Sequence, residues 1–178
     1  MSDAGLQLPP SVCSLLLEQL PLADPGDAAM ALIDRARELL LGTGLMTLNA
    51  NLMPDAGESQ SVELQRVWTS NATSYPVAGR KLKPATPWSR TVLREGRVFV
   101  GEGDAAIASA FDDHAVIAAL GLHAIVNTPI LENGRCVATV NILGAQAAWT
   151  FAERMAIRLL ALLAAPSARE AARRARVD

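Results

Sequence analysis

Apolar side chains recur at helical spacing near the start of the chain and again at its end. Between residues 27 and 41 they form one stripe, made of Ala29, Leu32, Ile33, Ala36, Leu39 and Leu40. This spacing predicts an amphipathic helix over residues 27–41, and a shorter helix is expected over residues 8–20. Thr150 followed by Glu153 has the pattern of a capping box, which predicts that a closing helix spans residues 151–164.

Runs of alternating apolar and polar residues predict β-strands in the middle of the chain. Residues 45–52 and 62–69 are expected to pair, and the turn Asn133-Gly134 predicts a hairpin between residues 122–131 and 135–143. The other elements are short: a strand over residues 97–100, and helices over residues 88–95 and 112–120, the last capped by Asp112 or Asp113. The whole pattern predicts an α+β fold, a central antiparallel sheet with helices packed on one face.

One face of the predicted sheet carries polar side chains. In the first strand one face holds Met46, Leu48, Ala50 and Leu52, and the other holds Thr47, Asn49 and Asn51. In the last strand Cys136, Ala138, Val140 and Ile142 lie opposite Val137, Thr139, Asn141 and Leu143. Asparagine is depleted in strands, and Asn127 adds another amide to this face. The polar character of the face therefore requires an explanation. Either it meets water, or it floors a cavity whose amides bind a small polar ligand.

The long segment over residues 70–87 gathers basic and aromatic side chains. The two lysines of the chain, Lys81 and Lys83, follow Arg80, and its one tyrosine, Tyr75, comes just before them. Trp88 stands directly after the segment. Such a set suits an anionic ligand with a flat or apolar part. The alternative is a solvated loop in which Tyr75 and Trp88 serve as packing anchors.

Composition narrows the classes of function. The chain of 178 residues is 51% hydrophobic and 19% charged, which predicts a folded domain rather than a disordered chain. Its net charge of -2 argues against electrostatic binding to nucleic acid or to an acidic membrane. No basic residue precedes the first apolar run, and no apolar run is long enough to span a bilayer, so we expect a cytoplasmic protein.

No catalytic motif stands out in the sequence. Two cysteines, Cys13 and Cys136, and two histidines, His114 and His123, lack the spacing of a metal site, so neither a metal nor a cofactor is expected. Cys136 has apolar neighbours in a predicted strand, where a thiol behaves as a small hydrophobic side chain. We find no nucleophile elbow, phosphate loop or dinucleotide fingerprint, and therefore do not expect an enzyme.

Residues 27–163 resemble the GAF domain, a small-molecule-sensing fold related to PAS. The resemblance rests on the segments 88–92 (WSRTV), 96–100 (GRVFV), 111–114 (FDDH), 120–122 (LGL), 125–130 (IVNTPI), 134–143 (GRCVATVNIL) and 149–150 (WT). It implies a central antiparallel sheet, helices on one face that form a dimer interface, and a ligand pocket on the other face. Residues 75–81 and 86–88 also resemble stand-alone bacterial GAF proteins.

Three activities of the GAF family can be compared with this sequence. Cyclic-nucleotide binding has an Asn-Lys-x-Phe-Asp-type motif, which is absent, and bilin attachment requires a suitably placed cysteine, which is not evident. Free methionine-R-sulfoxide reductases use several clustered cysteines, whereas residues 88–122 contain none. A redox enzyme of that kind, using Cys136, therefore remains only as an alternative.

The sequence thus predicts a small-molecule-binding sensory or regulatory module whose ligand is a small polar or anionic metabolite. The expected parts are an N-terminal helical extension (1–26), a GAF domain (27–164) and a basic C-terminal tail (165–178) that is a frayed helix or disordered. The expected ligand-binding residues are Arg66, Tyr75, Arg80, Lys81, Lys83, Trp88, Asn127, Thr139 and Asn141.

A homodimer through the terminal helices is also expected. In the predicted closing helix only Glu153, Arg154 and Arg158 interrupt an apolar surface, and such a helix is normally buried on more than one side. The alternative is that the N-terminal helix covers it within one chain. Two further possibilities stay open: a separate signalling protein that reads the ligand-bound state, and a pure dimerisation module with a vestigial pocket.

Overall fold

The fold is built on one antiparallel sheet. The computed structural model describes residues 6–57 and 60–177. Within these residues six strands pair in the order β3-β2-β1-β6-β5-β4. The strands are β1 (Gly44–Asn51), β2 (Val62–Thr69), β3 (Arg80–Lys83), β4 (Phe99–Glu102), β5 (Ala124–Glu132) and β6 (Arg135–Gly144). The predicted hairpin of β5 and β6 is confirmed, with Asn133 and Gly134 at φ 51° and 77° as a tight turn requires.

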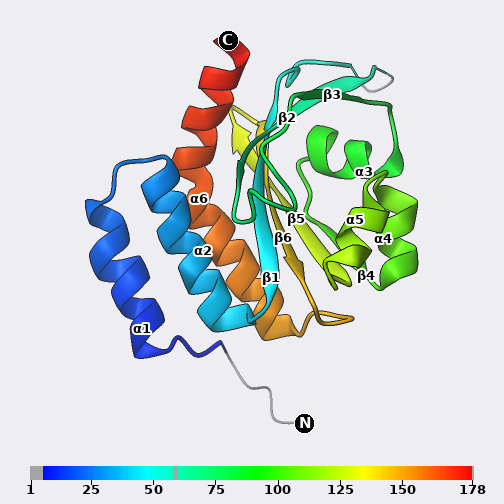
Figure 1. Cartoon of the computed structure of the whole chain (residues 1–178). Coiled ribbons are helices and arrows are strands. Elements are labelled where there is room, and N and C mark those ends of the chain that lie inside the picture. The colour runs from blue at the N-terminus through cyan, green and yellow to red at the C-terminus, as the bar shows by residue number, and fades with distance from the viewer. Residues whose placement is uncertain (1–5, 58–59, 178) are drawn as a thin grey trace.

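Two long helices cover one face of this sheet (Figure 1). α2 (Asp27–Leu41) and α6 (Phe151–Val177) bury a core against β1 and β6 that includes Ile33, Met46, Val140 and Leu160. The amphipathic helix over residues 27–41 is confirmed, and so is the capping box, in which the Glu153 N–H donates to the Thr150 hydroxyl at 3.2 Å. Apolar periodicity and a cap were therefore sufficient to locate this layer.

The N-terminal extension is helical, as predicted, and lies beside α2. It consists of α1 (Pro10–Cys13), a π-helical turn η1 (Ser14–Gln19) and a 3-10 turn η2 (Leu20–Leu22). Val12 and Leu16 join the main core. The extension covers α6 only in part, since Leu159 and Leu162 remain 46% and 65% exposed. Cover within one chain therefore accounts for part of the apolar surface of the closing helix.

Short helices and a long segment cover the other face. The helices are α3 (Pro87–Ser89), the π-helical η3 (Arg90–Arg94), α4 (Asp104–Ala110) and α5 (His114–Ala119). Residues 70–86, here called the strap, leave β2 and return along it as β3 (Figure 1). The fold is α+β as predicted, but only the long helices are confined to one face. α4 was not predicted, and β3 lies within a segment that was expected to be irregular.

The expectations for the end of the last helix and for the chain that follows it are both wrong, because this part of the chain is packed. The last helix does not end at Ala164 but continues through Pro166 to Val177, because small residues beyond that point are buried. Among them, Ser167 accepts the Gly26 N–H through its Oγ at 3.0 Å. The residues expected to form a frayed or disordered tail are thus a packed helix. The predicted division at residues 164 and 165 falls inside it.

A β-bulge changes the face on which Cys136 lies. Ile130 pairs with Ala138 but Leu131 pairs with Cys136, so Val137 is an extra residue in β6. Strict alternation would place Cys136 with Ala138 on the face of the long helices. The bulge instead turns it to the opposite face, where it packs with Trp88 in a separate cluster.

Candidate functional site

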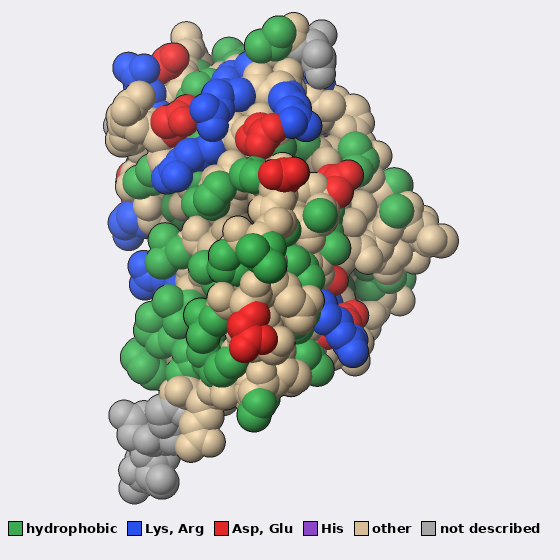
Figure 2. All heavy atoms as spheres, turned by 90° about the vertical axis from the view of Figure 1, so that its left-hand side faces the viewer, with side chains coloured by type: hydrophobic (Ala, Val, Ile, Leu, Met, Phe, Trp, Pro, Cys, Tyr) green, Lys and Arg blue, Asp and Glu red, His purple; other side chains and the backbone are tan. Residues whose placement is uncertain are grey.

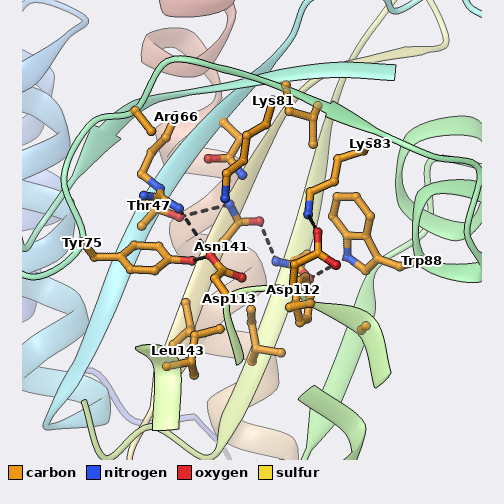
Figure 3. Close-up of a pocket in the computed structure, with 18 of the residues that line it drawn as sticks. Thr47, Arg66, Tyr75, Lys81, Lys83, Trp88, Asp112, Asp113, Asn141 and Leu143 are labelled. Atoms are coloured by element: carbon orange, nitrogen blue, oxygen red, sulfur yellow. Dashed lines mark hydrogen bonds and ion pairs between the residues drawn. The ribbon is translucent and has the colours of Figure 1, made fainter. Parts of the chain in front are cut away.

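A cavity of about 100 Å³ lies between the second face of the sheet and the strap (Figure 3). Its lining consists of Thr47, Asn49, Leu64, Arg66, Tyr75, Ala78, Gly79, Lys81, Lys83, Pro84, Thr86, Trp88, Ala110, Phe111, Asp112, Asp113, Ile117, Ile125, Asn127, Asn141 and Leu143. The polar face of the sheet therefore does not meet open water. Asn127 and Asn141 are only 2% and 4% exposed and form part of the cavity floor.

A directed chain of hydrogen bonds crosses this floor (Figure 3). Trp88 Nε1 donates to Asn127 Oδ1 at 3.0 Å, and Asn127 Nδ2 donates to Asn141 Oδ1 at 2.6 Å. Asn141 Nδ2 then donates to Thr47 Oγ1 at 3.1 Å. Because an indole N–H can only donate, Trp88 fixes the orientation of both amides. The hydroxyl hydrogen of Thr47 ends the chain and is left for a further acceptor.

Tyr75, Arg66 and Asp113 form a polar cluster at one wall. The Tyr75 hydroxyl donates a short hydrogen bond to Asp113 Oδ2. The Arg66 guanidinium lies 3.6 Å above the centre of the Tyr75 ring and 3.6 Å from Asp113 Oδ2. Burial raises the pKa of Tyr75, and the adjacent Asp113 carboxylate raises it further. The phenol therefore stays protonated and remains a donor.

Asp113 does not cap α5 as expected. It occupies the residue before the helix, but its side chain makes no capping hydrogen bond. Its carboxylate is instead directed at Tyr75, which lies 38 residues earlier in the chain. A charge-assisted hydrogen bond to a buried phenol competes here with a cap at the start of a short helix.

The strap carries three basic side chains, which differ in their position relative to the cavity and in their ion-pair partners. Lys83 Nζ donates to Asp112 Oδ2 at 2.8 Å, and this ammonium holds the pKa of Asp112 below its usual value. Lys81 lines the cavity and has no carboxylate within ion-pair distance in the described part of the chain. Arg80, on the opposite side of β3, lies outside the cavity and 3.8 Å from Glu63.

Seven of the nine predicted site residues meet at the cavity lining: Arg66, Tyr75, Lys81, Lys83, Trp88, Asn127 and Asn141. Arg80 and Thr139 are absent from it; Thr139 is fully buried and pairs with Asn49 in the sheet. Thr47, Asn49, Asp112 and Asp113 line the cavity but were not predicted as site residues. Strand alternation placed Thr47 and Asn49 on the polar face, whereas no local signal directs the two aspartates to the strap.

Cys136 is poorly suited to redox chemistry in this structure. Its side chain is 2% exposed, and burial raises its pKa to about 12. Its Sγ donates to the Ala138 carbonyl at 3.3 Å, and it does not line the cavity. Cys13, the other free cysteine, belongs to α1 on the far side of the sheet. A protonated, buried thiol is a weak nucleophile.

The described residues, 6–57 and 60–177, give information on metal binding and on membrane spanning. Among them, no group of three or more histidine, cysteine, aspartate or glutamate side chains is placed to hold a metal ion. None of the helices formed by these residues is long and apolar enough to cross a membrane.

Solved structures share this fold at low sequence identity. The GAF domain of a phosphoenolpyruvate-protein phosphotransferase from Coxiella burnetii is similar with a TM-score of 0.64 and 19% identity, covering 92% of this chain and 95% of that one. The GAF domain of a two-component sensor histidine kinase from Bacillus halodurans is similar with a TM-score of 0.58 and 16% identity, covering 83% and 96%.

A bacteriophytochrome provides a third likeness. The chromophore-binding domain of a bacteriophytochrome from R. palustris is similar with a TM-score of 0.58 and 13% identity. That match covers 90% of this chain but only 60% of the bacteriophytochrome chain. At such identities the likenesses establish the fold alone.

Sequence comparison gives the family. No curated protein matches the chain. The family model of the GAF domain matches residues 12–167, which include α2, the first part of α6, all six strands and the cavity lining. The chain therefore belongs to the GAF domain family.

Proposed function

We propose that this protein is a sensory or regulatory module that binds a small polar or anionic metabolite in the cavity beneath the strap. The observation that carries the proposal is the enclosed floor, where amide side chains are oriented by hydrogen bonds before any ligand arrives. Preorganised polar groups in a largely apolar cavity are typical of small-molecule sites. GAF domains of sensory proteins among the similar structures are consistent with this role.

Charge supports an anionic ligand. Arg66 and Lys83 are each offset by an aspartate, whereas Lys81 lines the cavity with no ion-pair partner in the described chain. The lining thus carries one net positive charge. In a partly enclosed site an ammonium attracts an anion more strongly than it would in open water.

A thermal-shift screen against a metabolite library tests the proposal, with free methionine sulfoxide and cyclic nucleotides included. A ligand present at about 100 times its Kd stabilises a protein by about 2.7 kcal/mol, which raises the Tm of a chain of this size by about 5–10 °C. The shift should be reduced in Lys81→Gln and unchanged in Arg80→Gln, a matched control because Arg80 lies next in sequence but outside the cavity. A library without any hit contradicts the proposal.

We also propose that the chain forms a homodimer through its terminal helices. An apolar groove of about 200 Å³ between them is lined by Leu6, Leu8, Cys13, Leu16, Leu17, Leu40, Ala156, Leu159, Leu160, Leu162 and Leu163. In Figure 2, hydrophobic side chains gather over the lower part of this face. A second copy of the chain would bury these side chains, and a second copy is present wherever the protein is made.

A further inference from the structure

Two neighbouring rows of side chains cross the cavity face of the sheet, and they differ in how their hydrogen bonds are satisfied. The first row is Thr47, Asn141 and Asn127, which register opposite one another across β1, β6 and β5. Its members bond to each other, and Trp88 closes the row. This row is complete without a ligand, apart from the Thr47 hydroxyl hydrogen.

The second row is Arg66, Asn49 and Thr139, which register opposite one another across β2, β1 and β6. Each holds a buried polar atom that has no hydrogen-bond partner among the described residues: Arg66 Nε, Asn49 Oδ1 and Thr139 Oγ1. Arg66 and Asn49 line the cavity, and Thr139 lies fully buried beside Asn49. Buried polar atoms are nearly always paired in native proteins, so an unpaired row at a cavity calls for a ligand.

The chemistry of the unpaired atoms specifies what that ligand must offer. Arg66 Nε is a charged donor and requires an acceptor, as does the unpaired ammonium of Lys81 nearby in the lining. Asn49 Oδ1 is an acceptor only, so it requires an N–H or O–H donor. Side chains directly opposite across two strands lie about 4.5–5.5 Å apart at Cβ. The anionic group and the donor must therefore be close together in the ligand.

We infer that the cavity binds a small carboxylic acid that carries an N–H or O–H donor next to its carboxylate, as α-hydroxy and α-amino acids do. The carboxylate meets Arg66 Nε and Lys81 Nζ, the adjacent donor meets Asn49 Oδ1, and the remainder of the molecule packs on apolar lining such as Ile117 and Leu143. A cavity of about 100 Å³ admits about seven to ten non-hydrogen atoms. This inference rests on the proposed binding function and gives it a ligand class.

Matched acids test the inference by titration calorimetry on the full chain. Each hydrocarbon skeleton is used with and without the donor: lactate, alanine and propanoate; 2-hydroxy-3-methylbutanoate, valine and 3-methylbutanoate; 2-hydroxy-4-methylpentanoate, leucine and 4-methylpentanoate. For at least one skeleton we expect the acid with a donor to bind about ten-fold or more tightly than the acid without one, because the latter leaves Asn49 Oδ1 unpaired. This comparison uses wild-type protein and needs no variant to fold.

Substitution of Asn49 provides the second arm. In Asn49→Leu the preference for the donor should fall to less than about two-fold, while Arg80→Gln, outside the cavity, should keep it. An acid that binds equally well with and without the donor overturns the inference but leaves the proposed binding function standing. Absence of binding by all nine acids also overturns it, whereas the library screen decides the binding function separately. Tighter binding of inorganic phosphate than of any acid would likewise overturn it.

Discussion

The net charge of the cavity depends on which of its basic side chains pair with an aspartate. Asp113 lies 3.6 Å from the Arg66 guanidinium, and Asp112 lies 2.8 Å from Lys83 Nζ, so two of the three basic groups are already offset. Lys81 supplies the remaining charge. Exposed ion pairs contribute little to stability, and Asp112 is 85% exposed. Asp112 therefore matters more for the ligand charge that the cavity accepts than for folding.

Tyr75→Phe tests the contact between the strap and Asp113. The substitution removes the hydroxyl that donates to the carboxylate but keeps the ring beneath Arg66. Hydrogen bonds to charged groups contribute about 1.5–3 kcal/mol, so the free energy of unfolding should fall by about that amount. Urea unfolding at neutral pH measures the change. Wild-type stability in Tyr75→Phe would mean that the hydroxyl makes no net contribution.

The raised pKa of Tyr75 also predicts a pH dependence. An unfolded tyrosine ionises near about pH 10, whereas the folded one keeps its proton to higher pH. Protons are then released on unfolding, so stability is lost as pH rises above about 10. Cys136, with its pKa raised to about 12, gives a loss of the same sign that begins near its unfolded pKa of about 8.5. Above about pH 10 stability should fall less steeply in Tyr75→Phe than in wild type, and parallel curves would contradict the assignment.

The two cysteines should differ sharply in reactivity. Cys136 is buried with a raised pKa, while Cys13 is only partly buried. We expect iodoacetamide to modify Cys13 in the native protein and both thiols in urea, as measured by intact mass. Cys136→Ala should leave the native reaction unchanged. Rapid native modification of Cys136 would instead support the redox-enzyme alternative.

At the scale of elements, those that carry their own local signal were predictable from sequence. The apolar period of residues 27–41 and the Asn133-Gly134 turn specify α2 and the β5–β6 hairpin without reference to the rest of the chain. β3 could not be found in this way, because its four residues become a strand only by pairing with β2. The extension of α6 likewise depends on a distant contact between Ser167 and Gly26.

The residues of the candidate site were likewise predictable only where a local sequence signal exists. Alternation along β1 and β6 was enough to place Thr47, Asn49 and Asn141 on one polar face. It failed only where the β-bulge at Val137 moved Cys136 to that face. Asp113 escaped prediction because its partner, Tyr75, belongs to the strap, and sequence periodicity carries no information about such a pair.

Pro166 offers a test of α6 as one continuous element. It lies inside the helix on an exposed position, where it removes one backbone hydrogen bond. Proline is about 3 kcal/mol less favourable than alanine in a helix interior. We therefore expect Pro166→Ala to raise the free energy of unfolding by about 1–3 kcal/mol, measured by urea unfolding. A loss of stability would mean that proline at this position is required for the packing of α6 on α2.

At the scale of the whole molecule, β1 and β6 connect the two faces. Their polar side chains form the cavity floor, and their apolar side chains contact α2 and α6. A ligand bound beneath the strap can affect the helices through these two strands and through β2 and β5, which also contact α6. A second route is Val77 of the strap, which lines a groove together with Ser167 and Ala171 of α6. Signals from the cavity would therefore reach the surface formed by the terminal helices.

The proposed dimer predicts the effect of a charge on that surface. Leu17 and Leu162 are 70% and 65% exposed beside the apolar groove, and both would be buried by a second copy. Leu162→Glu should weaken the dimer at least about ten-fold, because an unpaired carboxylate would be placed in an apolar contact. Leu82→Glu is the matched control, since Leu82 is 69% exposed on β3, at the edge of the sheet. Sedimentation measures the effect, and a wild-type protein that stays monomeric at micromolar concentration would contradict the dimer.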